Sequence, residues 1–373
     1  MHATKSALVL LLIANGIEGF FTPTLKNSKM RSSSTVEEIV DTIEDSVTPI
    51  KDKKVELGDF KVAPLGIGTW QWGDNLYWEY KKSMDAELQE TFDFCVYNGI
   101  NFFDTAEIYG FGRSEYLCGK FRRDYKSKNG INDDLVIATK FAAFPLPTRL
   151  NRKAVVNACK RSLDRMGQSS IELYQIHFPS IVKNEEYWEG LADCYDQGLV
   201  KTVGVSNYGP EMLQKAYDAL QKRGVPLSSN QVQYNILYRK AETNGLIEKC
   251  NNLGVKIIAY SPLAQGLLTG KYSQSNLPTG PRSRNFKQYL NKSEDLLNLL
   301  KKISEEKEKN VSQIALAWCI SKGVIPIAGV KNLSQAEENI GALDCQLSEE
   351  QIKEIDTLSD NIKFKPAGDL MGK

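Results

Sequence analysis

The feature that most constrains this chain is a regular alternation of short apolar segments with longer amphipathic ones. Such alternation predicts βαβ units and a parallel sheet. Eight strand–helix pairs in roughly 300 residues fit a closed (β/α)8 barrel, the TIM barrel, better than an open doubly wound sheet. The expected strands span residues 65–68, 100–103, 135–139, 173–176, 202–205, 230–233, 256–259 and 325–327.

The segments between these strands have the length and pattern of helices. Ahead of the first strand, residues 54–65 carry Gly58 and Asp59 at their centre, which predicts an N-terminal β-hairpin. The fold class is therefore α/β, a barrel preceded by a hairpin. The expected helices span residues 85–98, 114–121, 152–166, 185–197, 210–223, 241–252, 311–321 and 334–343.

The N-terminal region has the composition of a targeting segment. Residues 1–19 hold a short apolar run behind Lys5, as in a signal peptide, and residues 20–52 begin with a basic, serine-rich stretch typical of a transit peptide. Together they resemble the bipartite presequences of algae whose plastids lie inside extra membranes, which indicates a plastid protein; a secreted protein is the alternative. The barrel is expected over residues 53–362, followed by a tail over 363–373.

Charge and cysteine content narrow the classes of partner. A formal net charge of +1 over 373 residues does not indicate nucleic acid or an acidic membrane as the main partner, so a small-molecule substrate is favoured. The apolar run at residues 7–13 is too short for a membrane anchor. The seven cysteines are scattered without a CxxC pair, which predicts reduced core residues, no metal site and no disulfide frame, and argues against secretion.

The common nucleotide-binding loops are absent from the expected positions. Gly66 and Gly68 follow the pattern of a dinucleotide-binding loop, but no third glycine completes it, and no Walker lysine loop occurs. A nucleotide would therefore have to bind without a glycine-rich phosphate-binding loop.

Four chemically active residues follow three consecutive expected strands. Asp104 and Tyr109 come after the second strand, Lys140 after the third and His177 after the fourth, and the strand ends of a barrel meet at one rim. A tyrosine is more useful as a general acid when a nearby ammonium stabilises its phenolate, a part that Lys140 can take with Asp104 holding it charged. A neutral His177 can donate a hydrogen bond to a carbonyl oxygen. Taken singly, each residue has a structural alternative, as a helix cap, loop filler or buried counter-ion.

The motifs around these residues resemble those of one family. FFDTAEIYG at 102–110, Lys140 and LYQIH at 173–177 look like the catalytic tetrad motifs of the aldo-keto reductases. The similarity extends over about residues 55–358, and QVQYN at 231–235 with YSPLAQG at 260–266 makes it closest to the plastid-type and potassium-channel-β-like members. The resemblance implies that Asp104, Tyr109, Lys140 and His177 are catalytic, with Tyr109 as the proton donor.

The same resemblance implies an extended NADPH across the barrel mouth. Ser206, Asn207 and Gln231 would meet the nicotinamide amide, and Tyr260 would stack on its ring. Lys331 at the start of the last helix would favour the 2′-phosphate of NADPH, although many relatives have an arginine where this chain has Gln335, which weakens the expected preference over NADH. The segment 264–310 resembles a strap over the pyrophosphate. The remaining expected cofactor-binding residues are Gly68, Thr69, Trp70, Ser261, Pro262, Leu263, Gln265, Lys271, Arg284, Gly329, Glu338 and Asn339.

An aromatic substrate pocket is expected beside the tetrad, from Trp70, Trp72 and Phe141 with Tyr77, Trp78 and Phe144 nearby. The favoured function is NADPH-dependent reduction of an aldehyde or ketone to an alcohol. An NADPH-binding redox-sensing module with little turnover is the alternative, and a hydrolytic or isomerase barrel, which would bind no nicotinamide, is weaker. No protein partner is indicated.

Overall fold

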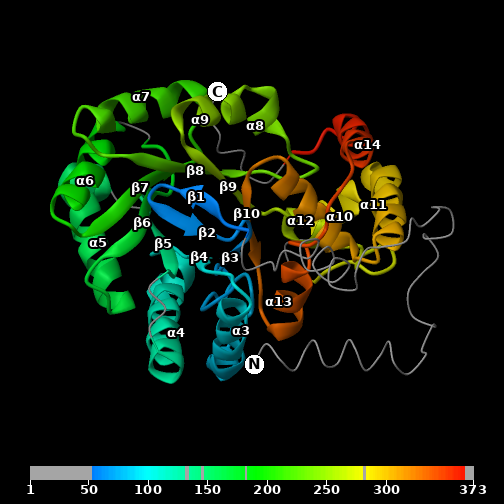
Figure 1. Cartoon of the computed structure of the whole chain (residues 1–373), viewed down its shortest axis with the longest axis horizontal. Helices are drawn as coiled ribbons and strands as arrows, with labels where there is room; N and C mark the ends of the chain where they lie inside the picture. Colours follow the sequence, from blue (N-terminus) through cyan, green and yellow to red (C-terminus); the bar gives the residue numbers. More distant parts are fainter. Residues whose placement is uncertain (1–52, 131–133, 144–146, 181–182, 280–282, 366–373) are drawn as a thin grey trace, which may run out of the picture. The chain divides into compact units, whose positions relative to one another are not determined.

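The computed structural model describes residues 53–130, 134–143, 147–180, 183–279 and 283–365. Eight parallel strands close into a barrel in chain order, and the last strand pairs with the first (Figure 1). The (β/α)8 barrel predicted from the alternation is therefore confirmed, and each expected strand overlaps an observed one. The strands are β3 (Gly66–Gly68), β4 (Phe102–Asp104), β5 (Val136–Phe141), β6 (Ile171–Ile176), β7 (Val200–Ser206), β8 (Leu227–Gln233), β9 (Lys256–Tyr260) and β10 (Ile325–Gly329).

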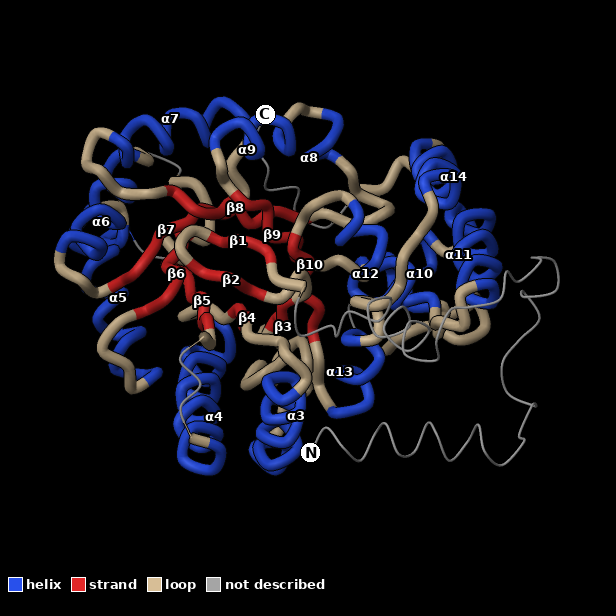
Figure 2. The backbone as a smooth tube through the Cα atoms, viewed as in Figure 1, coloured by secondary structure: helices blue, strands red, loops and turns tan. Residues whose placement is uncertain are grey.

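Helices surround the barrel strands (Figure 2). All eight expected helical segments are helical in the structure. The corresponding helices are α3 (Asp85–Tyr97), α4 (Arg113–Asn129), α5 (Arg152–Met166), α6 (Glu185–Asp196), α7 (Pro210–Gln221), α8 (Lys240–Thr243), α9 (Leu246–Leu253), α12 (Val311–Ser321) and α13 (Leu333–Ile340).

Several helix boundaries differ from the expectation. Helix α4 extends eight residues beyond the expected end at 121, because its second half is polar and gives no apolar period. The single helix expected over 241–252 is two, α8 and α9, separated at Gly245 with a φ of 76°. The segment 264–310, expected to be a strap, contains α10 (Ser283–Tyr289) and α11 (Glu294–Glu306), and α14 (Glu349–Asp360) follows the barrel. Helix α11 buries Leu296, Leu300 and Ile303, a helical spacing that the expectation overlooked.

The predicted N-terminal hairpin is formed by β1 (Val55–Leu57) and β2 (Phe60–Val62), and it closes one end of the barrel. Leu57 and Val62 are fully buried against a cluster of apolar side chains that includes Phe102 and Leu173 of the barrel strands. The turn uses Gly58, whose φ of 59° is the left-handed conformation that glycine adopts without strain. With this end closed by apolar packing, the opposite rim, where the strands end, is left for a site.

The described core contains no paired cysteine. All seven cysteines are free; six are buried, as predicted for core residues, and Cys345 is half-buried. Within the described ranges, no helix is long and apolar enough to cross a membrane. The predicted targeting segments, 1–19 and 20–52, lie outside the described residues, as do residues 366–373 of the predicted tail.

Candidate active site

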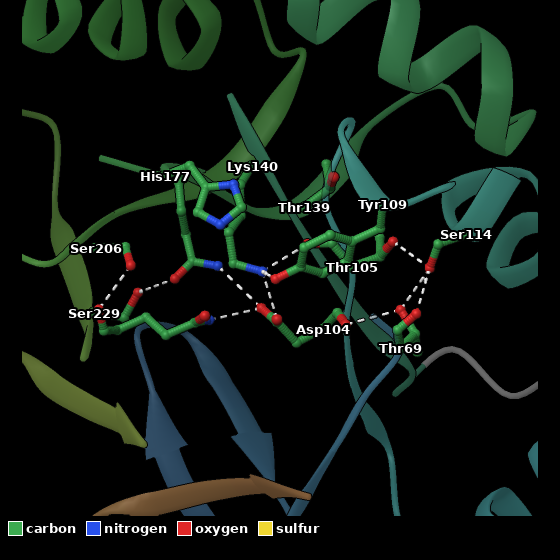
Figure 3. A network of polar contacts seen from close by, with 12 residues as sticks. Thr69, Asp104, Thr105, Tyr109, Ser114, Thr139, Lys140, His177, Ser206 and Ser229 are labelled. Carbon is green, nitrogen blue, oxygen red and sulfur yellow. Dashed lines mark hydrogen bonds and ion pairs between the residues drawn. The ribbon is translucent and has the colours of Figure 1, made fainter. Parts of the chain in front are cut away.

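The four predicted catalytic residues come together at the carboxyl rim of the barrel (Figure 3). Asp104 is the last residue of β4, and Tyr109 begins the 3-10 turn η3 (Tyr109–Gly112) that follows it. Lys140 lies near the end of β5, and His177 comes directly after β6. Neighbouring strand ends thus bring residues up to 73 positions apart in the sequence into one cluster.

Lys140 and Asp104 form a buried ion pair at the base of this cluster. Lys140 Nζ lies 2.5 Å from Asp104 Oδ1, donates to the Thr105 carbonyl at 2.7 Å and lies 3.5 Å from the Tyr109 hydroxyl. The other carboxylate oxygen, Asp104 Oδ2, accepts from Gln231 Nε2 at 2.7 Å and from Gln175 Nε2 at 3.3 Å. Both oxygens of Asp104 therefore have donors, as a buried carboxylate requires.

The electrostatics of Tyr109 differ from the sequence-based expectation. Lys140 was expected to lower the pKa of the phenol, but burial, with a smaller effect of Asp104, holds the pKa of Tyr109 well above its usual range. Burial also lowers the pKa of Lys140, against the opposing effect of Asp104. Because burial disfavours the charged phenolate, Tyr109 keeps its proton at neutral pH.

His177 is a neutral imidazole in this site. Burial, with a smaller effect of Lys140, lowers the pKa of His177 well below its ordinary value. Its ring meets Tyr109 edge-on at a centroid distance of 5.8 Å and stacks on Phe178 at 4.3 Å. Its Nδ1 atom is buried without a hydrogen-bond partner among the described residues. A neutral imidazole next to the phenol is suited to align a carbonyl oxygen by hydrogen bonding.

The turn that carries Tyr109 has an unusual backbone. Gly110, Phe111 and Gly112 have φ values of 53°, 54° and 89°, and left-handed backbone is costly for a residue such as phenylalanine. Gly110 packs so closely on the carbonyl of Gly73 that a Cβ atom would overlap it. Glycine at 110 is therefore needed both for conformation and for space, and the loop between β3 and α3, which contains Gly73, packs against the turn.

A cavity of about 510 Å³ opens above the cluster. Asp104, Tyr109 and His177 line it, and Lys140 lies beneath them. All but one of the predicted cofactor-binding residues line it as well; Arg284 lies on α10, and its side chain is outside the described part. The lining residues in this set are Gly68, Thr69, Trp70, Ser206, Asn207, Gln231, Tyr260, Ser261, Pro262, Leu263, Gln265, Lys271, Gly329, Lys331, Gln335, Glu338 and Asn339.

The polar residues expected to meet a nicotinamide are already bonded to one another. Asn207 donates to the His177 carbonyl at 3.1 Å and to Ser206 Oγ at 3.0 Å, and it accepts from the Tyr260 hydroxyl at 3.0 Å. Ser206 Oγ donates to the Gln231 carbonyl at 2.7 Å. Asn207 has a φ of 65°, so the site also holds local backbone strain. The network fixes these side chains before any ligand arrives.

The far end of the cavity contains charged groups and the start of α13. Lys271 Nζ lies 2.8 Å from Glu338 Oε2, and Ser312 donates to Glu338 Oε1 at 2.8 Å. Lys331 Nζ donates to the Trp78 carbonyl at 3.1 Å, and its backbone N–H donates to Gln335 Oε1 at 2.9 Å. The segment 264–310 therefore reaches α13 through Lys271.

Two buried polar atoms of the cavity wall fit a polar ligand. Asn339 Nδ2 and Gln71 Oε1 have no hydrogen-bond partner within the described ranges. Buried polar groups are nearly always hydrogen-bonded in native proteins. An extended molecule with polar groups along its length, such as a dinucleotide, would satisfy both.

The predicted aromatic pocket is divided between the cavity wall and the core. Trp70 lines the cavity and stacks on Tyr77 at 5.2 Å, and Trp78 and Ile108 also line it. Trp72 is instead fully buried and donates from Nε1 to the Val330 carbonyl at 2.9 Å. Phe141 is likewise buried and packs on Tyr187.

The spacing of the neighbouring tryptophans did not indicate that the ring of Trp72 points into the core. Nothing in the sequence around Phe141 indicated that its ring is buried either. Phe144 lies outside the described residues. Phe178, which lines the cavity beside His177, was not expected there, although its position next to a strand-end histidine was a usable signal.

No group of three or more histidine, cysteine, aspartate or glutamate side chains is arranged to hold a metal ion in the part of the chain that the structure describes. The cavity is lined by amides, hydroxyls, aromatic rings, Lys271 and Lys331, together with the separate side chains of Asp104, His177 and Glu338. They suit an organic ligand with phosphate groups better than a metal centre.

Comparisons with known proteins agree with this geometry. The profile of the Aldo/keto reductase family matches residues 64–360. The chain is 45% identical over 307 residues to a protein named "Pyridoxal reductase, chloroplastic" from Arabidopsis thaliana, covering 80% of this chain and 84% of that one.

Solved structures give the same result. The thermostable aldo-keto reductase Tm1743, crystallised with the inhibitor epalrestat, is 31% identical with a TM-score of 0.67, over 82% of this chain and 99% of that one. An aldo/keto reductase from Klebsiella pneumoniae, crystallised with NADP and acetate, is 25% identical with a TM-score of 0.66, over 84% and 98% of the two chains.

Proposed function

The chain belongs to the aldo/keto reductase family and is an NADP-dependent oxidoreductase, and on this premise we propose that it reduces an aldehyde or ketone to an alcohol with Tyr109 as the proton donor. The observation that carries the proposal is the meeting of a protonated phenol, a buried ammonium–carboxylate pair and a neutral imidazole at one cavity. This combination suits proton delivery to a carbonyl oxygen.

NADPH is proposed as the reductant, and when bound it supplies the hydride that adds to the carbonyl carbon. Ser206, Asn207 and Gln231 would hold the nicotinamide amide, and Tyr260 would lie against its ring. Lys331 and Asn339 would hold the adenosine end, where an amide without a partner and a lysine charge are available.

Each tetrad residue has a part in this proposal. The neutral His177 donates a hydrogen bond to the carbonyl oxygen and holds it near Tyr109. Tyr109 transfers its proton to that oxygen as negative charge develops there, which completes the alcohol. Lys140 stabilises the resulting phenolate by its charge at 3.5 Å, and Asp104 holds the ammonium in place at 2.5 Å.

An aromatic aldehyde is proposed as the substrate class. Trp70 and Trp78 form an aromatic wall beside Tyr109, with Trp70 at a ring distance of 6.2 Å from the phenol. Planar rings pack well against such a wall. Since a 45% identical relative is named a pyridoxal reductase, pyridoxal is the first aldehyde to test.

The test is steady-state oxidation of NADPH by the purified full-length chain with pyridoxal, benzaldehyde and a linear aliphatic aldehyde. Turnover with the aromatic aldehydes that is lost in Tyr109→Phe supports the proposal. Tight NADPH binding without turnover on any aldehyde would overturn it and favour the redox-sensing module. Turnover on the aliphatic aldehyde alone would contradict the proposed substrate class but not the reaction.

A plastid location is proposed, because the composition of residues 1–52 is that of a targeting segment and a relative is named as chloroplastic. We also propose that residues 53–362 form the catalytic barrel and 363–373 a tail. A fluorescent protein fused after residue 52 should enter the plastid of an algal host, whereas export to the medium would favour the secreted alternative.

A further inference from the structure

Glu115 is a fully buried carboxylate that takes no direct part in the proposed reaction. It lies in the first turn of α4, six residues after Tyr109. Its Oε1 atom accepts from Thr139 Oγ1 at 2.6 Å, and its Oε2 atom lies 2.5 Å from Arg165 Nε. A buried charge is costly and persists only where its partners compensate it. The question is therefore what the Glu115–Arg165 pair holds in place.

The contacts of Glu115 join the two segments that carry Tyr109 and Lys140. Thr139 immediately precedes Lys140 in β5, and because side chains alternate along a strand, one reaches α4 while the other reaches Asp104. Glu115 thus ties the start of α4 directly to the strand of the ammonium.

Arg165 links Glu115 to the turn that carries Tyr109. It lies at the end of α5, and an added Cβ atom at Gly112 would come within 2.5 Å of its side-chain Cδ. Arg165 therefore packs under the last residue of the turn that begins at Tyr109. It also donates to Ser162 at 3.0 Å, which fixes the guanidinium on its own helix.

The neighbouring residue Ser114 strengthens the same attachment. Its hydroxyl lies 2.7 Å from Thr69 Oγ1 and accepts from Thr105 Oγ1 at 2.8 Å, and these two threonines follow β3 and β4 (Figure 3). Ser114 and Glu115 together fix the start of α4 to the ends of β3, β4 and β5. The strained turn before them then has little freedom to move.

We propose that Glu115 and Arg165 are positioning residues that set the separation of the Tyr109 hydroxyl from Lys140 Nζ. This inference rests on the proposed function. The separation of 3.5 Å is at the outer limit of a hydrogen bond, so a small shift of the turn would remove the contact. Misplacement of a reacting group by about 1 Å can cost as much as a hundredfold in rate.

The test compares a double variant with a matched control. Glu115→Met with Arg165→Met removes both charges together, which avoids leaving either one buried alone. The control is Glu172→Met with Arg122→Met. That pair also joins a buried carboxylate to an arginine, at 2.9 Å, and its arginine lies further along α4. Thr139→Val, which leaves the ion pair intact, is the milder second variant.

For the Glu115/Arg165 variant we expect kcat to fall about tenfold or more, with the KM for the aldehyde and the affinity for NADPH within about twofold. Thr139→Val should lower kcat in the same way but less, and the control should keep the wild-type kcat. Wild-type kcat in both test variants would overturn the proposal. So would an equal loss in the control pair, because the role would then be general stability.

Amide hydrogen exchange of a peptide covering residues 108–115 provides a readout that does not need turnover. Exchange should quicken in the Glu115/Arg165 variant and stay unchanged in the control. If the wild type reduces no aldehyde, the proposed function fails, while the exchange result still decides whether the pair holds the turn. Unchanged exchange in the test variant would overturn the positioning role.

Discussion

Lys140 Nζ lies 2.5 Å from Asp104 Oδ1 with neither side chain exposed to solvent beyond 1%. Two charges withdrawn from water in this way are stable only as a pair with further donors. Here Gln231 and Gln175 donate to the carboxylate, and the ammonium donates in turn to the Thr105 carbonyl. The base of the site is therefore a fixed unit on which Tyr109 rests.

The first prediction concerns the stability of this unit. Lys140→Met should lower the free energy of unfolding by about 3–5 kcal/mol, because Asp104 remains as a buried charge without its counter-ion. Adding Asp104→Leu should recover much of the loss while the enzyme stays inactive. Urea unfolding at neutral pH measures both, and a single variant within about 1 kcal/mol of wild type would contradict the prediction.

The second prediction concerns the proton donor. Tyr109→Phe should lower kcat for aldehyde reduction by about 10²–10⁴-fold, the range expected when a general acid is lost. Binding of NADPH, measured by quenching of tryptophan fluorescence, should change less than about twofold. Tyr116→Phe, on the half-exposed surface of α4, is the control and should keep wild-type turnover. Equal activity in the two variants would exclude Tyr109 as the donor.

The barrel was predictable because its signal is local and repeated. Short apolar strands such as 135–139 and 256–259 recur with helices between them, and closure follows from their number. The polar half of α4 has no such signal, since Arg122–Asn129 buries no residue in an apolar stripe. Helices α10 and α11 were not predicted, because the glycine, proline and arginine content of their segment masked the spacing of Leu296, Leu300 and Ile303.

The four catalytic residues could be predicted from the sequence, but not all of the residues that hold them in place. Asp104, Tyr109, Lys140 and His177 stand at strand ends, where chemistry in a barrel is expected. Gln175 shares the face of His177 by strand alternation, so its contact with Asp104 had a usable signal. No sequence signal marked Glu115, because a glutamate in the polar first turn of a helix is expected at the surface. Only the structure shows its contacts with Arg165 and Thr139.

The third prediction concerns cofactor choice. Lys331→Met should weaken NADPH binding about tenfold and NADH binding less than twofold, because only NADPH carries the 2′-phosphate that a lysine charge would attract. Fluorescence titration with each cofactor measures the ratio. Lys153→Met, an exposed residue of α5, should leave both affinities unchanged. Equal weakening for NADPH and NADH would mean that Lys331 acts through its contact with Trp78 rather than on phosphate.

The fourth prediction follows from the depressed pKa of His177. The folded protein keeps this imidazole neutral well below the ordinary pKa of 6.5, while the unfolded chain binds a proton there. At pH values between the folded-state pKa of His177 and 6.5, the unfolded state holds more protons than the folded state. The free energy of unfolding must therefore fall as the pH falls through this range. At about pH 5 the loss attributable to His177 should be at most about 2 kcal/mol, since each pH unit below 6.5 is worth about 1.4 kcal/mol.

His177→Gln should remove this loss, because glutamine does not titrate. Unfolding by urea at about pH 7.5 and about pH 5 measures the loss of stability for wild type and variant, and the wild type should lose more than the variant. The comparison cancels every carboxylate that titrates alike in both proteins. The chain's other histidine, His2, is present in both the wild type and the variant, so its titration cancels too. Equal pH dependence would mean that the pKa of His177 is the same in the folded and unfolded states, which would contradict its depression by burial.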